Sequence, residues 1–276
     1  MYGMNDRFES AAGREVRIAA LGDLHFDPEA RGQLRDLFAE IDRSADVLAL
    51  CGDLTTHGKP EQLLALLDEM AGLKSPVVAV LGNHDFESGM AEQLMALMRE
   101  RGIHVLDGSY VVVEGIGFAG TKGFVGGFGR GALAPFGEQL IKDFVQGSIE
   151  EALKLENALR NLHTEQKVVL LHFAPIVETV VGEPEIIYPF LGSSRLAQPL
   201  DMIGASVVFH GHAHHGTHSA RTPGGIPVYN VALPLLRQAG HRYLLWTTPA
   251  VERRRAEPSA TKPAGTAETA ERIRAG

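Results

Sequence analysis

Short apolar runs alternate with helix-patterned segments along most of the chain. The runs lie at 16–21, 47–50, 77–81, 168–171 and 207–209 and are continuous, which is typical of strands buried on both faces. Between them, apolar residues recur at helical spacing over 34–41 and 60–70, and further helices are predicted over about 88–101 and 148–162. This alternation predicts parallel strands joined by helical crossovers, hence an α/β layered fold.

A second class of segment is rich in β-forming residues and closely spaced. These segments lie at 103–106, 110–114, 117–119, 227–231 and 242–246. The turn-forming pair Asp107-Gly108 and the single Gly115 separate the first three of them. We therefore expect antiparallel hairpins added to the parallel part of the sheet.

The two ends of the chain differ in composition from its centre. Residues 1–14 are polar and mixed, without the pattern of a secretory signal, and the sequence from Thr248 onward has no apolar periodicity. We expect a flexible segment over 1–14, one catalytic domain over 15–247 and a disordered tail over 248–276. No apolar stretch is long enough for a membrane span, and we expect a cytoplasmic protein.

Charge and cysteine content narrow the classes of partner. The net charge of −8 makes a nucleic-acid partner unfavourable and a small substrate more plausible. Cys51 is the single cysteine, which excludes an intramolecular disulfide, and we expect it to be a small buried residue that ends a strand.

Metal-ligand residue types follow five of the predicted strands. Singly, an Asp or His after a strand is more often a turn, a cap or a structural hydrogen-bonding group. Together, five fragments at the carboxyl ends of strands, four of them with a Gly beside the donor, indicate one shared site. The fragments are Asp23-Leu24-His25, Gly52-Asp53, Gly82-Asn83-His84-Asp85, His172 and Gly211-His212-Ala213-His214.

In content and order this set resembles the signature of the calcineurin-like metallophosphoesterases, over about residues 16–246. The resemblance implies two mixed β-sheets packed as a sandwich and flanked by helices. It also implies two divalent metal ions, drawn from Mn²⁺, Fe²⁺ or Fe³⁺, Zn²⁺ and Co²⁺, which suit oxygen and imidazole ligands. One ion would be held by Asp23, His25, Asp53 and His214, and the other by Asp53, Asn83, His172 and His212, with Asp53 shared.

The resemblance gives His84 a catalytic role rather than a ligand role. It would face the phosphate and stabilise developing charge or protonate the leaving group. Many relatives carry an Asp three residues after the bridging Asp to orient this His, whereas this chain has Thr56. Asp85 and His57 are candidates for that task, although Asp85 also fits a turn or capping role.

The activity implied is hydrolysis of a phosphoester by attack of a metal-activated hydroxide on phosphorus. The second fragment lacks the Asp-Arg-Gly ending of the protein serine/threonine phosphatases, and the chain looks more like bacterial phosphodiesterases of small molecules, including cyclic nucleotides. A phosphomonoesterase, a nucleotide pyrophosphatase and a non-catalytic scaffold stay open as alternatives. Residues 121–131 are a candidate substrate flap, and residues 173–192 a candidate pocket wall or homodimer contact.

Overall fold

Two mixed β-sheets stacked face to face form the centre of the protein in the computed structural model, which describes residues 15–248. The five-stranded sheet has the order β11-β1-β2-β3-β4 and the six-stranded sheet the order β5-β6-β7-β8-β10-β9. The bounds of the first sheet are β1 Arg17–Leu21, β2 Val47–Cys51, β3 Val77–Val80, β4 His104–Val105 and β11 Leu244–Thr247. Those of the second are β5 Ser109–Val113, β6 Ile116–Gly120, β7 Lys167–Leu170, β8 Val207–His210, β9 Ser219–Arg221 and β10 Pro227–Asn230.

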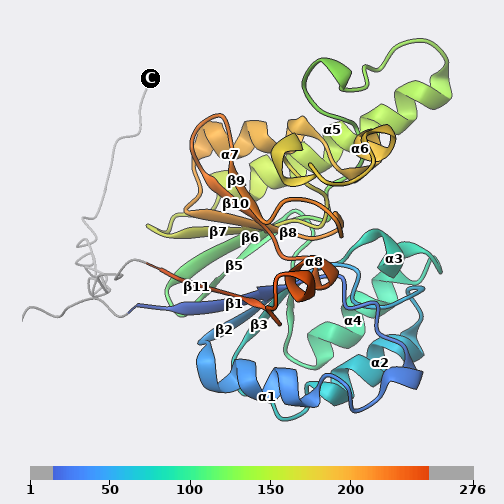
Figure 1. Ribbon diagram of the computed structural model, residues 1–276. Coiled ribbons are helices and arrows are strands. Elements are labelled where there is room, and N and C mark those ends of the chain that lie inside the picture. Colours follow the sequence, from blue (N-terminus) through green and yellow to red (C-terminus); the bar gives the residue numbers. More distant parts are fainter. Residues whose placement is uncertain (1–14, 249–276) are drawn as a thin grey trace, which may run out of the picture.

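Helices cover the outer face of each sheet. Figure 1 shows α5 and α7 against the six-stranded sheet and α1, α2 and α4 against the five-stranded one. Short helices α3, α6 and α8 lie in the loops at one edge of the sandwich. The bounds are α1 Arg35–Ser44, α2 Pro60–Glu69, α3 Asn83–Phe86, α4 Ala91–Glu100, α5 Gln139–Arg160, α6 Tyr188–Leu191, α7 Ala197–Ile203 and α8 Leu233–Gln238. The layered fold predicted from the resemblance is thus confirmed.

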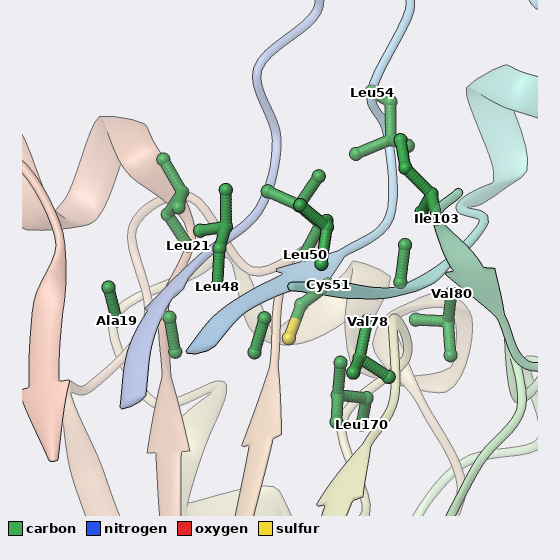
Figure 2. Packing of buried hydrophobic residues seen from close by; sticks show 14 of the residues in the cluster. Ala19, Leu21, Leu48, Leu50, Cys51, Leu54, Val78, Val80, Ile103 and Leu170 are labelled. Atoms are coloured by element: carbon green, nitrogen blue, oxygen red, sulfur yellow. The ribbon is translucent and has the colours of Figure 1, made fainter. Parts of the chain in front are cut away.

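The core consists of apolar layers on both sides of each sheet. In β7, Val168 and Leu170 pack in the layer between the sheets, whereas Val169 packs under α5 and α7. Figure 2 shows the side chains of Cys51 and Val78 directed toward Leu170 of the opposite sheet. The strands read as continuous apolar runs because both of their faces are buried. Cys51 is a buried free cysteine at the end of β2, as predicted.

Several element boundaries differ from the sequence prediction. The segment around 103–106 does not join a hairpin: β4 pairs in parallel with β3, in the other sheet from β5 and β6. Helix α5 begins at Gln139 rather than near Ser148. The sequence prediction missed its first two turns because they leave Leu140 and Phe144 exposed and show no buried apolar stripe. Strand β9 was not predicted, and it is only three residues long with no buried residue.

The strand directions bring the predicted site together. Strands β1, β2 and β3 run in parallel, as do β6, β7, β8 and β10, so their carboxyl ends meet at one edge of the sandwich. No helix within 15–248 is long and apolar enough to cross a membrane. The predictions for residues 1–14 and for residues 249–276 of the tail lie outside the described residues. Thr248, which was predicted to begin the disordered tail, is instead buried and hydrogen-bonded to Val16.

Candidate metal centre

The loops after five strands converge at this edge and are tied to one another through their backbones. The amide of Asp23 donates to the carbonyl of Gly52 at 2.9 Å, and the amide of His25 donates to the carbonyl of Asp53 at 3.0 Å. On the other sheet, the amide of Gly211 donates to the carbonyl of His172 at 3.2 Å. These backbone bonds hold the loops after β1 and β2, and those after β7 and β8, in register with each other.

These loops place all eight predicted site residues in one cluster. Three overlapping groups have candidate ligand atoms within 4.8 Å of one another, and the groups share His25 and Asp53. Asn83 joins them through its side-chain oxygen, which lies 2.9 Å from Nε2 of His172. The groups are Asp23, His25 and His214; His25, Asp53 and His84; and Asp53, His172 and His212.

The carboxylate of Asp53 lies at the centre of this arrangement. Its Oδ1 is 3.4 Å from Nε2 of His172 and accepts a hydrogen bond from the amide of His84 at 2.8 Å. Its Oδ2 is 3.7 Å from Nε2 of His25. At the far side of His25, Nε2 of His214 lies 3.1 Å from Oδ1 of Asp23. The two oxygens of Asp53 thus face two separate sets of imidazoles.

The residues present fit divalent cations. Nε2 of His25 is buried and has no hydrogen-bond partner within the described chain, although it faces two carboxylates. A buried unpaired imidazole nitrogen is costly unless a ligand satisfies it. The cluster offers carboxylate, amide and imidazole atoms without thiolate, which suits borderline divalent ions better than a structural zinc site.

The backbone of the site is strained where the ligand-type residues lie. Asp23, His25, Asp53 and His212 have φ values of 57°, 41°, 48° and 71°, and Glu114 is the only other described non-glycine residue with a positive φ. Such conformations cost free energy and tend to occur at functional sites. The concentration of strain here indicates that the loops are shaped for side-chain placement rather than for stability.

Two glycines beside the cluster are required by close approach. A Cβ on Gly82 would lie 2.1 Å from Oδ1 and 2.2 Å from the backbone N of Asp53. A Cβ on Gly211 would lie 2.3 Å from Oδ2 of Asp23. These distances explain why Gly precedes the donor residues in both fragments.

Backbone carbonyls fix the orientation of two of the imidazoles. Nδ1 of His172 lies 3.0 Å from the carbonyl oxygen of Cys51, and Nε2 of His212 lies 3.1 Å from that of Phe190. A carbonyl only accepts, so each contact requires an N–H and leaves the other ring nitrogen with its lone pair when the ring is neutral. Such second contacts are usual for metal-binding histidines. The contact from Phe190 also places the 173–192 segment at the edge of the cluster.

His84 is oriented by the backbone rather than by Asp85 or His57. Its Nδ1 donates to the carbonyl oxygen of Thr56 at 2.8 Å, and its Nε2 lies 4.0 Å from Oδ2 of Asp53. Asp85 instead accepts hydrogen bonds from the amides of Leu54, Thr55 and Gly82 and from the Thr55 hydroxyl. His57 pairs with Glu87 at the surface. The turn role proposed for Asp85 is therefore the one observed.

Electrostatics in the cluster couple the carboxylate to the imidazoles. Burial alone would raise the pKa of Asp53, but His172 and the amide of His84 outweigh it and hold that pKa well below its usual range. Burial opposes the charged form of His172, yet Asp53 raises the pKa of this histidine to about 9. For His212, burial and then the neighbouring His172 lower the pKa to about 4. Metal-binding histidines are neutral, so a cation held by His172 would compete with the proton that Asp53 favours on this ring.

Not every histidine of the 210–218 stretch belongs to the cluster. His210 is fully buried, and its two ring nitrogens contact the Gly211 carbonyl and the Thr179 hydroxyl at 2.8 Å each. Burial lowers its pKa to about 4. His210 is thus a satisfied neutral core residue that holds the 177–179 turn against β8.

Sequence reasoning missed one basic residue at this edge. Lys122 follows β6 and Thr121, and its ammonium group lies among the rings of Phe86, Phe124 and Phe173. Burial lowers the pKa of Lys122, and Glu151 acts in the opposite direction. Its position after a parallel strand is the same feature that identified the other residues, but a lone Lys was not read as part of the site.

Comparison with known proteins identifies the family. The model of the calcineurin-like phosphoesterases matches residues 16–216. The chain belongs to the calcineurin-like phosphoesterase family. Membership implies metal-dependent phosphoester hydrolysis. No protein with a curated description matches this chain.

Solved structures share the fold at low sequence identity. Phosphopantetheinyl hydrolase (PptH) from Mycobacterium tuberculosis matches with a TM-score of 0.64 and 15% identity, over 89% of this chain and 100% of that chain. The protein TT1561 of Thermus thermophilus matches with a TM-score of 0.51 and 16% identity, over 86% of this chain and 100% of that chain. At these identities the likeness concerns the fold alone.

Proposed function

We propose that this phosphoesterase hydrolyses a phosphodiester of a small molecule at a centre of two divalent metal ions that share Asp53. The observation that carries the proposal is the position of Asp53, with one carboxylate oxygen toward His172 and the other toward His25. A core salt bridge would need one partner, whereas this carboxylate faces His172 on one oxygen and His25 and His84 on the other. Nε2 of His25 has no hydrogen-bond partner among the described residues. Such an arrangement suits a bridging ligand.

The residues divide into two ligand sets around that carboxylate. When bound, a pair of divalent ions neutralises phosphoryl charge and lowers the pKa of water toward about 7. The amide of His212 donates to both oxygens of Asp23 at 3.0 Å, which fixes the orientation of that carboxylate. We assign Asp23, His25, Asp53 and His214 to one ion and Asp53, Asn83, His172 and His212 to the other.

His84 is proposed to act on the leaving group. Its Nδ1–H is committed to the Thr56 carbonyl, so its Nε2 is the nitrogen that exchanges a proton or donates to the substrate. To protonate a leaving oxygen, Nε2 must carry a hydrogen, which requires the doubly protonated ring. The side chain is 39% exposed, which leaves that nitrogen accessible to a ligand at the edge of the cluster.

The proposed substrate class follows from the net charge and from the residues after Asp53. The net charge of −8 and the lack of an Asp-Arg-Gly sequence after Asp53 favour a small phosphodiester, such as a cyclic nucleotide, over a phosphoprotein or a nucleic acid. One protein of the same fold is named a phosphopantetheinyl hydrolase, so a phosphopantetheinyl ester belongs in the substrate panel. The cytoplasmic location and the homodimer stay predictions from the sequence.

The direct test compares model substrates with the Mn²⁺-loaded protein. Bis(p-nitrophenyl) phosphate should be hydrolysed faster than p-nitrophenyl phosphate, and cyclic AMP, a dinucleotide and a phosphopantetheinyl ester then refine the class. Preference for the monoester would redirect the proposal to a phosphomonoesterase, and preference for the dinucleotide to a nucleotide pyrophosphatase. Failure to hydrolyse any of them with both ions bound would favour the non-catalytic scaffold.

A variant of His84 tests the mechanism. His84→Ala should keep the metal content and lower kcat by roughly 10²–10⁴-fold, with the larger loss on diesters whose leaving alcohol is poor. His104→Ala is a matched control, because His104 is an exposed histidine on β4. Equal losses for good and poor leaving groups would contradict proton donation, and parental kcat in His84→Ala would remove the residue from the mechanism.

A further inference from the structure

Hydrogen bonds to the backbone carbonyl of Lys122 fix this residue at the edge of the metal centre. Its carbonyl oxygen accepts hydrogen bonds from the amides of His172 and Phe173, at 3.0 and 3.1 Å. The loop after β6 is thereby fastened to the loop after β7, which carries His172. The α-carbon of Lys122 therefore lies beside a residue that we assign to the metal centre.

The side chain of Lys122 extends between two loops of the site. Its Nζ lies 5.3 Å from the ring centroid of Phe86, 4.9 Å from that of Phe124 and 5.1 Å from that of Phe173. Phe86 ends α3, the short helix that carries His84. The ring of Phe173 contacts that of His212, with centroids 4.5 Å apart. The ammonium group is thus positioned from both sides by elements that supply site residues.

The ammonium group has no direct ion-pair partner among the described residues, although Glu151 favours its charged form from farther away. No carboxylate of residues 15–248 forms an ion pair with Lys122, in contrast to Lys154, whose Nζ lies 2.8 Å from Glu151 and 3.0 Å from Asp107. Aromatic faces attract a cation but carry no net charge, so they do not neutralise the ammonium group as a paired carboxylate would. Burial at the same time lowers the pKa of Lys122.

The ammonium group also has unused hydrogen-bond donors. One N–H of Lys122 donates to the carbonyl of Gly123 at 2.9 Å. An ammonium has three donors, and no other acceptor within residues 15–248 is bonded to this one, so two donors remain for a ligand. Glu151, the carboxylate with the largest electrostatic effect on Lys122, is already engaged by the Thr121 hydroxyl, the Gly123 amide and Lys154.

We propose that Lys122 binds an anionic oxygen of the phosphoryl group that is hydrolysed, held in place by the cage of Phe86, Phe124 and Phe173. This inference rests on the proposed function and adds a substrate-binding residue to it. A cation that faces uncharged rings rather than a paired carboxylate, at the edge of a site for anionic substrates, supplies a charge-assisted hydrogen bond that water-exposed lysines provide only weakly. The rings replace the counter-ion that would otherwise compete with the substrate.

The test uses substitutions that separate charge from packing. Lys122→Met keeps an unbranched side chain with favourable sulfur–aromatic contacts but removes the charge. Lys122→Arg keeps the charge. Lys74→Met is the matched control, because Lys74 is exposed and precedes β3 at the opposite edge of the sheet. Metal content is measured first in all four proteins.

Binding is measured by calorimetric titration of the Mn²⁺-loaded proteins with inorganic phosphate, which requires no turnover. Lys122→Met should bind phosphate roughly 10- to 100-fold more weakly than the parent, as expected for one lost charge-assisted hydrogen bond. Lys122→Arg should stay within about 5-fold, since the charge persists. Lys74→Met should match the parent. The KM for bis(p-nitrophenyl) phosphate should rise in parallel in Lys122→Met.

Three outcomes would overturn the inference. Parental phosphate affinity in Lys122→Met would show that the ammonium does not touch the ligand. Loss of bound Mn²⁺ in both Lys122 variants would show that the residue is structural. A metal-loaded parent that binds no phosphate would contradict both the inference and the proposed function. By contrast, a parent that binds phosphate through Lys122 but hydrolyses no phosphoester would contradict the proposed function alone.

Discussion

Asp85→Asn is predicted to destabilise the protein and loosen the metal centre, although Asp85 itself is not assigned as a ligand. The Asp85 carboxylate is fully buried. Its Oδ2 accepts from the amides of Leu54 and Gly82, at 3.1 and 2.9 Å. Its Oδ1 accepts from the amide and hydroxyl of Thr55, at 2.9 and 2.7 Å. This single side chain joins the loop that carries Asp53 to the loop that carries His84.

The magnitude follows from which bonds an amide can replace. Asn keeps one oxygen for Thr55 but turns an NH₂ group toward the amides of Leu54 and Gly82, so two buried N–H groups lose their acceptor. Each unsatisfied buried group costs about 1–3 kcal/mol. Burial raises the pKa of Asp85, which means that its charge is itself costly, and removal of that charge offsets part of the loss. We expect a net loss of about 2–4 kcal/mol, out of a typical stability of about 5–15 kcal/mol.

The assay is urea unfolding of the metal-free proteins at pH 7, followed by titration with Mn²⁺. Glu87→Gln is the control, because Glu87 lies beside the same short helix but is exposed, with its carboxylate 3.0 Å from Nδ1 of His57 and 3.7 Å from Nδ1 of His84. This control should stay within about 0.5 kcal/mol of the parent, whereas Asp85→Asn should also bind Mn²⁺ more weakly. Parental stability and parental Mn²⁺ affinity in Asp85→Asn would refute the reasoning.

Two further substitutions test the packing of the site and a buried carboxylate away from it. Gly82→Ala should lower Mn²⁺ affinity sharply, because its Cβ would lie 2.1 Å from Oδ1 of Asp53; unchanged affinity in a metal titration would contradict the close approach. Glu69→Gln should cost about 1–3 kcal/mol in urea unfolding at pH 7, because Glu69 accepts from the amides of Gly32 and Leu34 and from Arg35. Those bonds hold the pKa of Glu69 below its ordinary 4.5 despite burial, so the stability they add is present above that pH and is lost as the pH falls through the lowered pKa. A difference between parent and Glu69→Gln that stays constant down to pH 3 would contradict this assignment.

The sequence was sufficient to predict the layered fold and the convergence of the site for one physical reason. Every fragment rich in ligand residues follows a buried strand, and parallel strands deliver their carboxyl ends to the same edge. The order of these fragments then carried the resemblance to the family. The structure brings Asp23, Asp53 and His172 together from three separate loops, as that reasoning requires.

The features that sequence reasoning missed depend on backbone geometry and on pairing partners. The carbonyl that orients His84 belongs to Thr56, and any residue at that position would supply the same acceptor. The apolar run at 103–106 shows that a strand forms, but not that β4 pairs with β3 instead of β5. The role of Lys122 became visible only from the rings around it, two of which, Phe86 and Phe173, are distant from it in sequence. None of these three contacts produces a periodic pattern of residues in the sequence, so sequence reasoning could not predict them.

The most direct test of the account is anomalous X-ray diffraction from crystals of the full-length protein grown with Mn²⁺. The account predicts two anomalous peaks, one on each side of the Asp53 carboxylate and roughly 3.5–4 Å apart. Peaks at a single position, or peaks that leave Asp53 without a cation on either oxygen, would contradict the shared carboxylate on which the proposed hydrolysis depends.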